Sequence, residues 1–360
     1  SVVDKAGNTA SDSIKTDVLD TQATITIASD GSGKDGVFNK TEAAAAAVSG
    51  STTGVEAGQT VTVTFTDSQN HVVSVDTKVG ANGSWSVPAQ SLSGLVDGNV
   101  TVKAEVSDVA GNKASDSHSD SLDTKATITI ASDGSGKDGV FNKTEAAAAA
   151  VSGSTTGVEA GQTVTVTFTD SQNHVVSVDT KVGANGSWTV PAQSLSGLVD
   201  GSVTVKAAVS DVAGNTATDS HSDSLDTKAT ITIASDGSGK DGVFNKTEAA
   251  AAAVSGSTTG VEAGQTVTVT FTDSQNHVVS VDTKVGANGS WTVPAQNLST
   301  LVDGAVTVKA QVSDLAGNTA TDSHKDGLDT LATIKITNDG SGGDHIFNQS
   351  EAGTVNVTGT

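Results

Sequence analysis

The sequence contains no cysteine, no methionine and no arginine, and aromatic residues make up 3% of it. Without cysteine no disulfide can form, so a domain must be held by its core or by bound metal. With 19 lysines against 41 acidic residues, the net charge is −22, and the clustered basic face that nucleic-acid binding needs is missing. No apolar run approaches the length of a membrane span. We therefore expect a soluble, monomeric, cation-binding chain, and the missing methionine suggests a fragment or a mature segment.

An internal repeat dominates what is present. The motif Leu-Asp-Thr begins at Leu19, Leu122, Leu225 and Leu328, a step of 103 residues, and the three tryptophans keep the same step. This length suits an autonomous β-sandwich and is too long for a solenoid unit. The predicted domains are three full repeats at 21–123, 124–226 and 227–329, preceded by the tail of another repeat (1–20) and followed by the start of a further one (330–360).

Alternating apolar residues predict an all-β fold with seven strands in each repeat. Trp85 is expected to point inward, and Asn82-Gly83 predicts a type I′ hairpin turn before it. The polar segment 113–120 is expected to be an edge strand. The strands of the first repeat are predicted at 23–27, 43–48, 60–65, 72–79, 84–87, 99–106 and 113–120.

The alanine run 43–47 has two possible structures. Alanine favours a helix by intrinsic propensity. However, the run lies between predicted strands, and Ala44, Ala46 and Val48 would give one inner face with a period of two. We predict a strand here.

The loop GSGKDG at 31–36 also allows two interpretations. It fits the G-x-G-x-x-G pattern of a dinucleotide site, but the next strand is half polar and Asp35 would repel a pyrophosphate. The alternative is calcium, because Asp35, Gly36, Phe38 and Glu42 follow the spacing of the second half of an EF-hand loop. Asp30 and Ser32 match the first half, with one extra residue before Asp35. We expect a calcium loop between strands.

A second calcium site is expected where two repeats meet. In a seven-strand sandwich the loop after the first strand faces the next repeat, whereas the loop before the last strand faces the preceding one. Asp30 and Asp35 of the first repeat, Asp123 in the linker and Asp211 of the second repeat would then lie together. Like charges at about 4 Å repel by roughly 1 kcal/mol in water, so a cation would stabilise this cluster. Whether Asp30 joins Asp35 around one ion or reaches across the junction stays open.

The predicted calcium ligands occupy equivalent positions in every repeat. They are Asp20, Asp30, Asp35, Asn39, Glu42, Asp108, Asp123, Asp133, Asp138, Asn142, Glu145, Asp211, Asp226, Asp236, Asp241, Asn245, Glu248, Asp314, Asp329, Asp339, Asp344, Asn348 and Glu351.

No catalytic constellation is predicted. Ser117, His118 and Asp120 contain the residue types of a hydrolase triad, but on a strand Ser117 and His118 point to opposite faces. We expect a solvated strand there, and we expect His71 to be a lone surface histidine.

Four motifs together resemble one family. They are Leu-Asp-Thr in the linker, D-G-V-F-N-x-x-E after the first strand, A-N-G-S-W in the hairpin and S-D-V-A-G-N before the last strand. They resemble the bacterial Ig-like extender repeats of giant RTX-type adhesins. The resemblance implies tandem sandwiches that use calcium near their junctions to form a stiff stalk, on a bacterial surface protein exported by type I secretion.

Two functions follow as hypotheses. The first is a calcium-rigidified spacer that projects terminal binding domains for adhesion or biofilm formation, with neighbouring repeats as its partners and no enzymatic activity. The second is a set of weak multivalent modules that bind glycans or proteins. The inward position predicted for Trp85 speaks against the second, because it leaves no aromatic platform for sugars.

Overall fold

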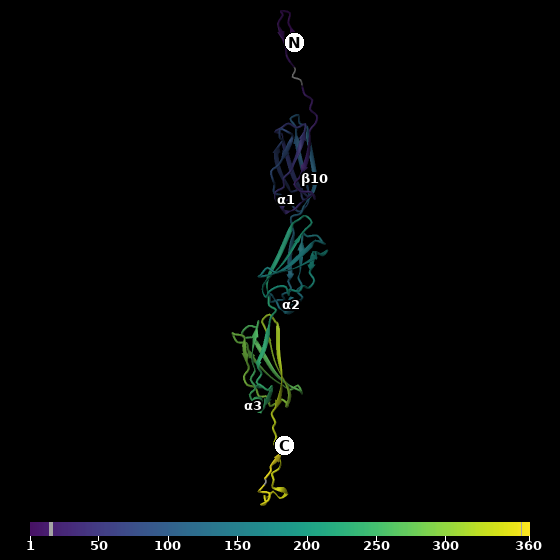
Figure 1. The fold of residues 1–360 in the computed structure, drawn as a ribbon. Helices are drawn as coiled ribbons and strands as arrows, with labels where there is room; N and C mark the ends of the chain where they lie inside the picture. Colours follow the sequence, from purple (N-terminus) through teal and green to yellow (C-terminus); the bar gives the residue numbers. More distant parts are fainter. Residues whose placement is uncertain (14–16, 354) are drawn as a thin grey trace.

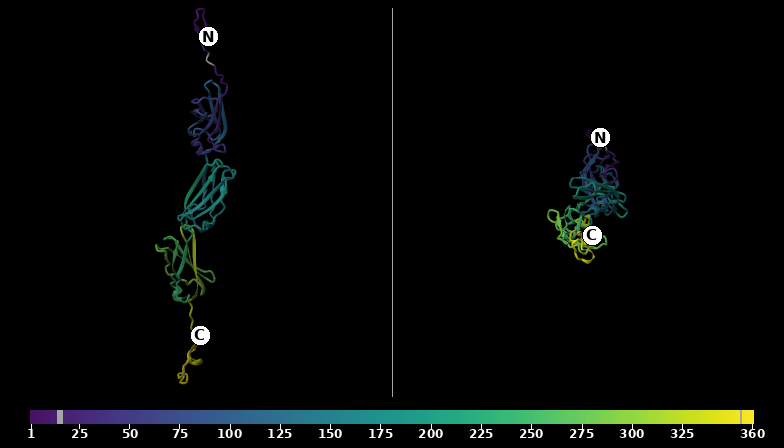
Figure 2. Two further views of the ribbon diagram at one scale, coloured as in Figure 1. Left: turned by 45° about the horizontal axis from the view of Figure 1, so that its top comes forward. Right: turned by 60° about the horizontal axis from the view of Figure 1, so that its bottom comes forward.

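The structure is a computed structural model that describes residues 1–13, 17–353 and 355–360, apart from the side chain of Asp344. Three β-sandwiches follow one another along a line, with the two chain ends at opposite ends of the molecule (Figures 1 and 2). Among the described residues, no helix is long and apolar enough to cross a membrane.

Each sandwich has eight strands and one short helix. In the first repeat these are β3 (Thr24–Ser29), β4 (Val37–Phe38), α1 (Lys40–Ala44), β5 (Ser49–Thr53), β6 (Thr60–Asp67), β7 (Val72–Lys78), β8 (Ser84–Ser86), β9 (Gly98–Ser107) and β10 (Lys113–Leu122).

The second and third repeats contain the same series. The second has β11 (Thr127–Ser132), β12 (Val140–Phe141), α2 (Lys143–Ala147), β13 (Ser152–Thr156), β14 (Thr163–Asp170), β15 (Val175–Lys181), β16 (Ser187–Thr189), β17 (Gly201–Ser210) and β18 (Thr216–Leu225). The third has β19 (Thr230–Ser235), β20 (Val243–Asn245), α3 (Lys246–Ala249), β21 (Ser255–Thr259), β22 (Thr266–Asp273), β23 (Val278–Lys284), β24 (Ser290–Thr292), β25 (Gly304–Ser313) and β26 (Thr319–Asp329).

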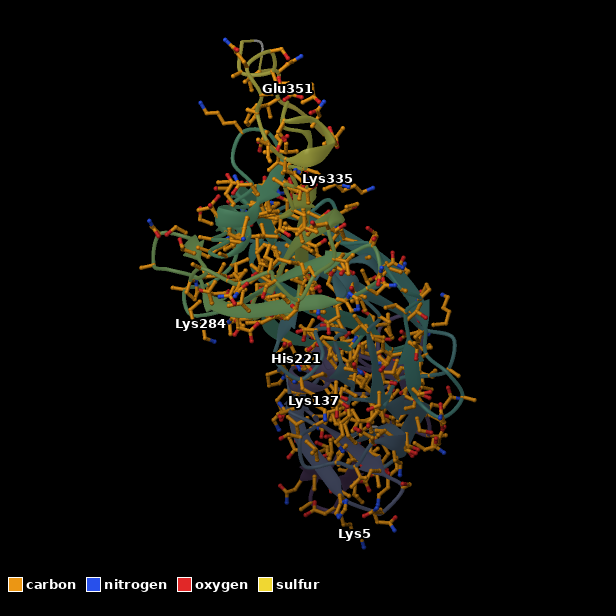
Figure 3. The ribbon with its side chains drawn as sticks, turned by 90° about the horizontal axis from the view of Figure 1, so that it is seen from below. Lys5, Lys137, His221, Lys284, Lys335 and Glu351 are labelled. Carbon is orange, nitrogen blue, oxygen red and sulfur yellow. The ribbon has the colours of Figure 1, made fainter. Side chains whose placement is uncertain are left out.

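Short elements lie outside the sandwiches. At the N-terminus β1 (Val2–Val3) pairs with β2 (Thr9–Ala10), and at the C-terminus β27 (Ile336–Asn338) pairs with β28 (Thr358–Gly359), with the 3-10 helix η1 (Gly342–Asp344) between them. Lys335 and Glu351 belong to this C-terminal segment (Figure 3).

Two sheets form each sandwich. One has the order β3-β5-β8 and the other the order β4-β10-β9-β6-β7. All pairs are antiparallel except β4 with β10, which run parallel through Val37 opposite Ser121 and Phe38 opposite Leu122. The prediction of tandem all-β sandwiches is confirmed. The prediction of seven strands missed β4, because a two-residue strand has no periodicity to detect.

The core of each repeat is drawn from that repeat alone. In the first repeat Phe38 and Phe65 meet edge to face at 6.1 Å between ring centroids. Trp85 is 3% exposed, which agrees with its predicted inward position. Its ring lies on Gly50 of the neighbouring strand, where an added Cβ would approach the ring to 2.6 Å. Gly50 therefore makes the space that the indole occupies.

Two local predictions were wrong. The alanine run does not begin as a strand, because α1 extends to Ala44 and β5 starts only at Ser49. Asn39, which was predicted to be a metal ligand, caps the helix instead. This cap outweighs the preference for a strand that the neighbouring strands suggested. Ala46 and Val48 are buried as predicted, whereas Ala44 is exposed.

The turn at Asn82-Gly83 is not type I′. Gly83 alone has a positive φ, of 79°, whereas a type I′ turn needs two such residues. The Gly83 amide donates to the Gly80 carbonyl at 3.0 Å. The turn leads from β7 in one sheet to β8 in the other, so it does not connect paired strands.

Candidate metal centres

The loop between β3 and β4 brings two predicted ligands beside one glycine. Gly33 has φ of 77°, and a Cβ added to it would lie 2.8 Å from Glu42 Oε1 and 3.7 Å from Asp35 Oδ1. The missing side chain of Gly33 thus lets the Glu42 carboxylate approach the loop backbone, with the Asp35 carboxylate nearby. Gly136 lies in the same way beside Glu145 and Asp138.

Asn39 and Glu42 form a capping box at the start of α1. Asn39 Oδ1 accepts from the amides of Thr41 and Glu42 at 2.9 and 3.0 Å, and Glu42 Oε2 accepts from the Asn39 amide at 3.1 Å. The cap holds Glu42 at the loop and leaves Oε1 outside these bonds. Asn39, predicted as a ligand, has its side-chain oxygen in the cap. Asn142 and Asn245 cap α2 and α3 in the same way.

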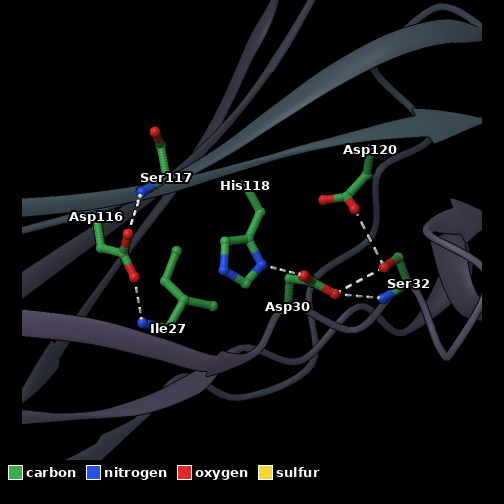
Figure 4. A network of polar contacts seen from close by, with 7 residues as sticks. All are labelled: Ile27, Asp30, Ser32, Asp116, Ser117, His118 and Asp120. Atoms are coloured by element: carbon green, nitrogen blue, oxygen red, sulfur yellow. Dashed lines mark hydrogen bonds and ion pairs between the residues drawn. The ribbon is translucent and has the colours of Figure 1, made fainter.

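Asp30 faces the interior of its own repeat. Its Oδ1 accepts from the Ser32 amide at 3.1 Å and from the Ser32 hydroxyl at 2.7 Å, and the His118 Nδ1–H donates to its Oδ2 at 2.5 Å (Figure 4). Burial alone would raise the pKa of Asp30, but these hydrogen bonds outweigh it and lower the pKa. Both oxygens of Asp30 thus bond to residues of its own repeat, Ser32 and His118. His118 is thus paired, where the sequence predicted only solvent.

Asp120 is an acidic residue near the loop that was not among the predicted ligands. Its Oδ1 accepts from the Ser32 hydroxyl at 3.4 Å, while its Oδ2 is buried and has no hydrogen-bond partner. Burial raises the pKa of Asp120, and the neighbouring Asp30 raises it further. Asp223 and Asp326 repeat this unpaired oxygen. A buried carboxylate oxygen without a hydrogen-bond partner suits a cation. In the sequence, Asp120 follows His118 by two residues, which places both side chains on the same face of a strand.

The junction between the first two repeats is held by one asparagine. Asn215 lies in the loop before β18 and is 6% exposed. Its Oδ1 accepts from the Lys40 amide at 2.7 Å, and its Nδ2 donates to the Asp123 carbonyl at 2.9 Å. It therefore joins the helix of one repeat, the linker and the loop of the next. Asn318 makes the same contacts with Lys143 and Asp226.

Acidic side chains gather around this junction. Partial burial raises the pKa of Asp123; the Lys125 amide opposes this, while Asp211, Asp97 and Glu159 raise the pKa further. Asp211 and Asp123 were predicted to meet here. Glu159 was not among the predicted residues, because nothing in the turn at 157–161 distinguishes it. At the next junction Asp226 is surrounded by Asp314, Asp200 and Glu262.

The carboxylates are not yet arranged as a coordination sphere. Asp211 accepts from the Asn215 amide and side chain at 2.7 Å each, so both of its oxygens are in use. Within the described residues, no three Asp, Glu or His side chains converge on one point as metal ligands. Bound calcium would have to draw these carboxylates together.

The remaining predicted ligands follow the same pattern at the ends of the chain. The Asn112 side chain donates to the Asp20 carbonyl at 3.2 Å and to Asp108 at 2.6 Å. In the C-terminal segment Asp339 accepts from Ser341, and Glu351 accepts from the Asn348 amide at 3.0 Å. Asp329 is the last residue of β26. The side chain of Asp344 lies outside the described part of the chain. Asp133 and Asp236 are the equivalents of Asp30 in the later repeats, and in the third repeat Asp241 and Glu248 are the equivalents of Asp35 and Glu42.

Comparison with known proteins gives matches among solved structures. No family model matches the chain, and no curated protein matches it either. A tetra-tandem repeat in the extending region of a large adhesion protein is 32% identical, over 88% of this chain and 77% of that one, with a TM-score of 0.30.

Two further structures are similar over comparable lengths. A Ca²⁺-stabilised adhesin that helps an Antarctic bacterium reach out and bind ice is 32% identical, over 96% of this chain and 83% of that one, with a TM-score of 0.36. A 1.5-MDa bacterial ice-binding adhesin is 29% identical, over 86% and 98%, with a TM-score of 0.33. The similarity lies in the sequence identity over most of each chain and not in the TM-scores.

Proposed function

The chain belongs to the tandem extender repeats of large RTX-type bacterial adhesins, and we propose that calcium at and near its junctions stiffens it. As a member of this family the chain is a structural spacer outside the cell, and its relatives are structural repeats rather than enzymes. Export by type I secretion and a monomeric rod are parts of the same proposal. The tryptophans of the three repeats, Trp85, Trp188 and Trp291, are all buried, which supports the spacer function over a glycan-binding module because none of them offers an exposed platform for a sugar.

The observation that carries the calcium proposal is the acidic junction. Asp123, Asp211 and Glu159 come from three segments that meet at the linker, and their mutual repulsion is relieved by a cation of the hard, oxygen-seeking kind. Lys125, the cation nearest in sequence, pairs instead with Asp97 at 3.4 Å.

A second ion is proposed for the loop after the first strand. The carboxylates of Asp35 and Glu42 lie beside Gly33, and Asp120 would contribute its buried oxygen, which has no hydrogen-bond partner. Calcium supplies charge neutralisation in both places. At the junction it would also fix the angle between repeats, because its ligands belong to both of them.

Calcium titration calorimetry on the whole chain tests the proposal. One variant set removes the loop carboxylate (Glu42→Gln, Glu145→Gln, Glu248→Gln), and a second removes the linker carboxylate (Asp123→Asn, Asp226→Asn). We expect each set to lose a separate class of bound ions. A control set on the exposed faces of β7, β15 and β23 (Asp76→Asn, Asp179→Asn, Asp282→Asn) should keep them all. The proposal would be refuted if the parent chain gave no heat of calcium binding. It would also be refuted if all variant sets bound the same number of calcium ions as the parent.

A further inference from the structure

A row of polar side chains on the last strand connects it to the first strand of the same repeat. Asp116, His118 and Asp120 alternate along β10 and so share one face. Asp116 Oδ2 accepts from the Ile27 amide at 2.7 Å, and His118 and Asp120 bond to Asp30 and Ser32 (Figure 4). We name this set of contacts the polar zipper: Asp116, His118 and Asp120 on one side, Ile27, Asp30 and Ser32 on the other.

The zipper replaces a main-chain ladder where the two sheets meet. Strands β3 and β10 belong to different sheets, so their backbones do not pair. Further along, the main chain takes over: the Ser121 amide donates to the Gly36 carbonyl, and the Asp123 amide to the Phe38 carbonyl, both at 3.0 Å.

All three repeats contain the zipper with nearly the same geometry. The Ile130 amide lies 2.7 Å from Asp219 Oδ2, and the Ile233 amide lies 2.8 Å from Asp322 Oδ2. The histidine pairs recur at 2.6 Å in both later repeats. In contrast, the outward positions of the same strand differ between copies: Ser119 is replaced by Lys325, and Ser121 by Gly327.

The path of the chain loads these contacts in shear. The residue numbers of the partners rise together, from Ile27 with Asp116 to Phe38 with Leu122. The two segments therefore run in the same direction. The segment that begins with β3 continues from the incoming linker at one end of the sandwich. Strand β10 continues into the outgoing linker at the other end. Tension along the chain therefore pulls them in opposite directions along their length, and the bonds share the load instead of opening one by one.

We propose that the polar zipper and the β4–β10 pairing form the load-bearing seam of each repeat, which sets how fast the repeat unfolds under tension. The inference rests on the proposed spacer function, because a stalk between a cell and its target transmits force. Forced unfolding is governed by the unfolding rate rather than by equilibrium stability. The seam can therefore matter under load more than its share of the equilibrium stability suggests.

Constant-force spectroscopy on the whole chain tests the seam. The zipper set carries Asp116→Ala, Asp219→Ala and Asp322→Ala. The control set carries Asp76→Ala, Asp179→Ala and Asp282→Ala, each of which removes one hydrogen bond, from a threonine at 2.7 to 2.8 Å on the opposite edge of the same sheet. Asp116 also accepts from the Ser117 amide at 2.9 Å, but that bond lies within β10 and does not cross the seam. We expect the zipper set to unfold about tenfold faster at a given force, the effect of losing the one charge-assisted hydrogen bond that crosses the seam. The control set should stay within about twofold of the parent.

Equal rates in the two sets would overturn the proposal. If the alanine set does not fold, the matching Asp→Asn set keeps an oxygen for the amide and should show a smaller rise; no rise there also overturns the proposal. Each measurement is repeated with chelator. If the zipper set still unfolds faster than the parent while the stiffness of the chain does not respond to calcium, the load-bearing seam is supported and the calcium-stiffened spacer is refuted.

Discussion

At the scale of single residues, Asp67 joins three segments through one buried carboxylate. Its Oδ1 accepts from the amides of Gln69 and His71 at 2.8 and 2.9 Å, and its Oδ2 accepts from the His71 ring and the Val96 amide at 2.8 Å each. His71, expected to be a lone surface histidine, is the partner of this carboxylate. Asp170 and Asp273 repeat the arrangement.

Replacing these aspartates should lower stability without touching the candidate calcium residues. An asparagine presents one acceptor oxygen where four donors converge, so Asp170→Asn leaves buried donors unpaired. We expect a fall of roughly 5–10 °C in the melting temperature of the second repeat, the scale for a domain of this size. The exposed variant Asp179→Asn serves as control, and melting by circular dichroism is the measurement. An Asp170→Asn melt equal to the control would contradict this role.

The same carboxylates predict the response to acid. Burial would raise the pKa of Asp67, but the bonds from Val96 and His71 hold it well below its usual value of 3.8. A depressed folded pKa contributes stability above the unfolded pKa, which is lost as the pH falls. We expect melting temperature to drop below about pH 4, and to drop less in a chain with all three aspartates replaced by asparagine. Parallel melting curves from pH 7 to pH 2 would contradict it.

His118 predicts a loss of stability in the opposite direction. The hydrogen bond to Asp30 raises the pKa of His118 above 6.5, against partial burial. A raised folded pKa contributes stability below the unfolded pKa, and this contribution disappears as the pH rises through the folded pKa. Replacing His118, His221 and His324 by glutamine should therefore cost more at pH 5.5 than at pH 9, measured by melting in chelator. An equal cost at both pH values would show that the charge plays no part.

At the scale of elements, α1 shows why the sequence-based prediction of this region failed. Its N-terminal cap and Glu42 form a box that starts one short turn of helix, after which the chain returns to a strand at Ser49. The motif was visible, but Asn39 and Glu42 were both used as ligands in the prediction. Local capping and metal binding need the same oxygens, and the sequence alone does not decide between them.

Removing the cap tests the helix directly. Asn142→Ala should cost about 1 kcal/mol of unfolding free energy, the usual effect of losing such a cap. The measurement is the urea midpoint of the chain, with the exposed Thr144→Ala as control. Equal midpoints would mean that α2 does not depend on Asn142.

The long strands were predictable because their apolar residues alternate and one face is buried. Val61, Val63 and Phe65 are each fully buried, as expected. The short strand β4 and the zipper were not predictable, since they depend on which segments tertiary folding brings together. Glu159 belongs to the same class: tertiary folding places its carboxylate at the Val212 amide, 3.0 Å away, and near Asp123 of the linker.

At the scale of the whole molecule, the junctions decide how three near-copies form one rod. Each junction has one buried asparagine that bonds to the preceding repeat, together with a cluster of acids whose repulsion opposes it. On a chain of net charge −22, a calcium ion bound at each junction, as proposed, would both neutralise these acids and connect the two repeats. Stiffness should therefore depend on calcium more than the folding of any single sandwich does.

Small-angle X-ray scattering of the chain, with calcium and then with chelator, measures how far its stiffness depends on calcium. We predict a rod of well-defined maximum dimension with calcium, and a broader distribution of lengths in chelator, while circular dichroism shows the sandwiches still folded. The Asp123→Asn, Asp226→Asn variant should scatter like the chelated chain even with calcium present. Identical scattering profiles for the parent in calcium and in chelator would contradict the account.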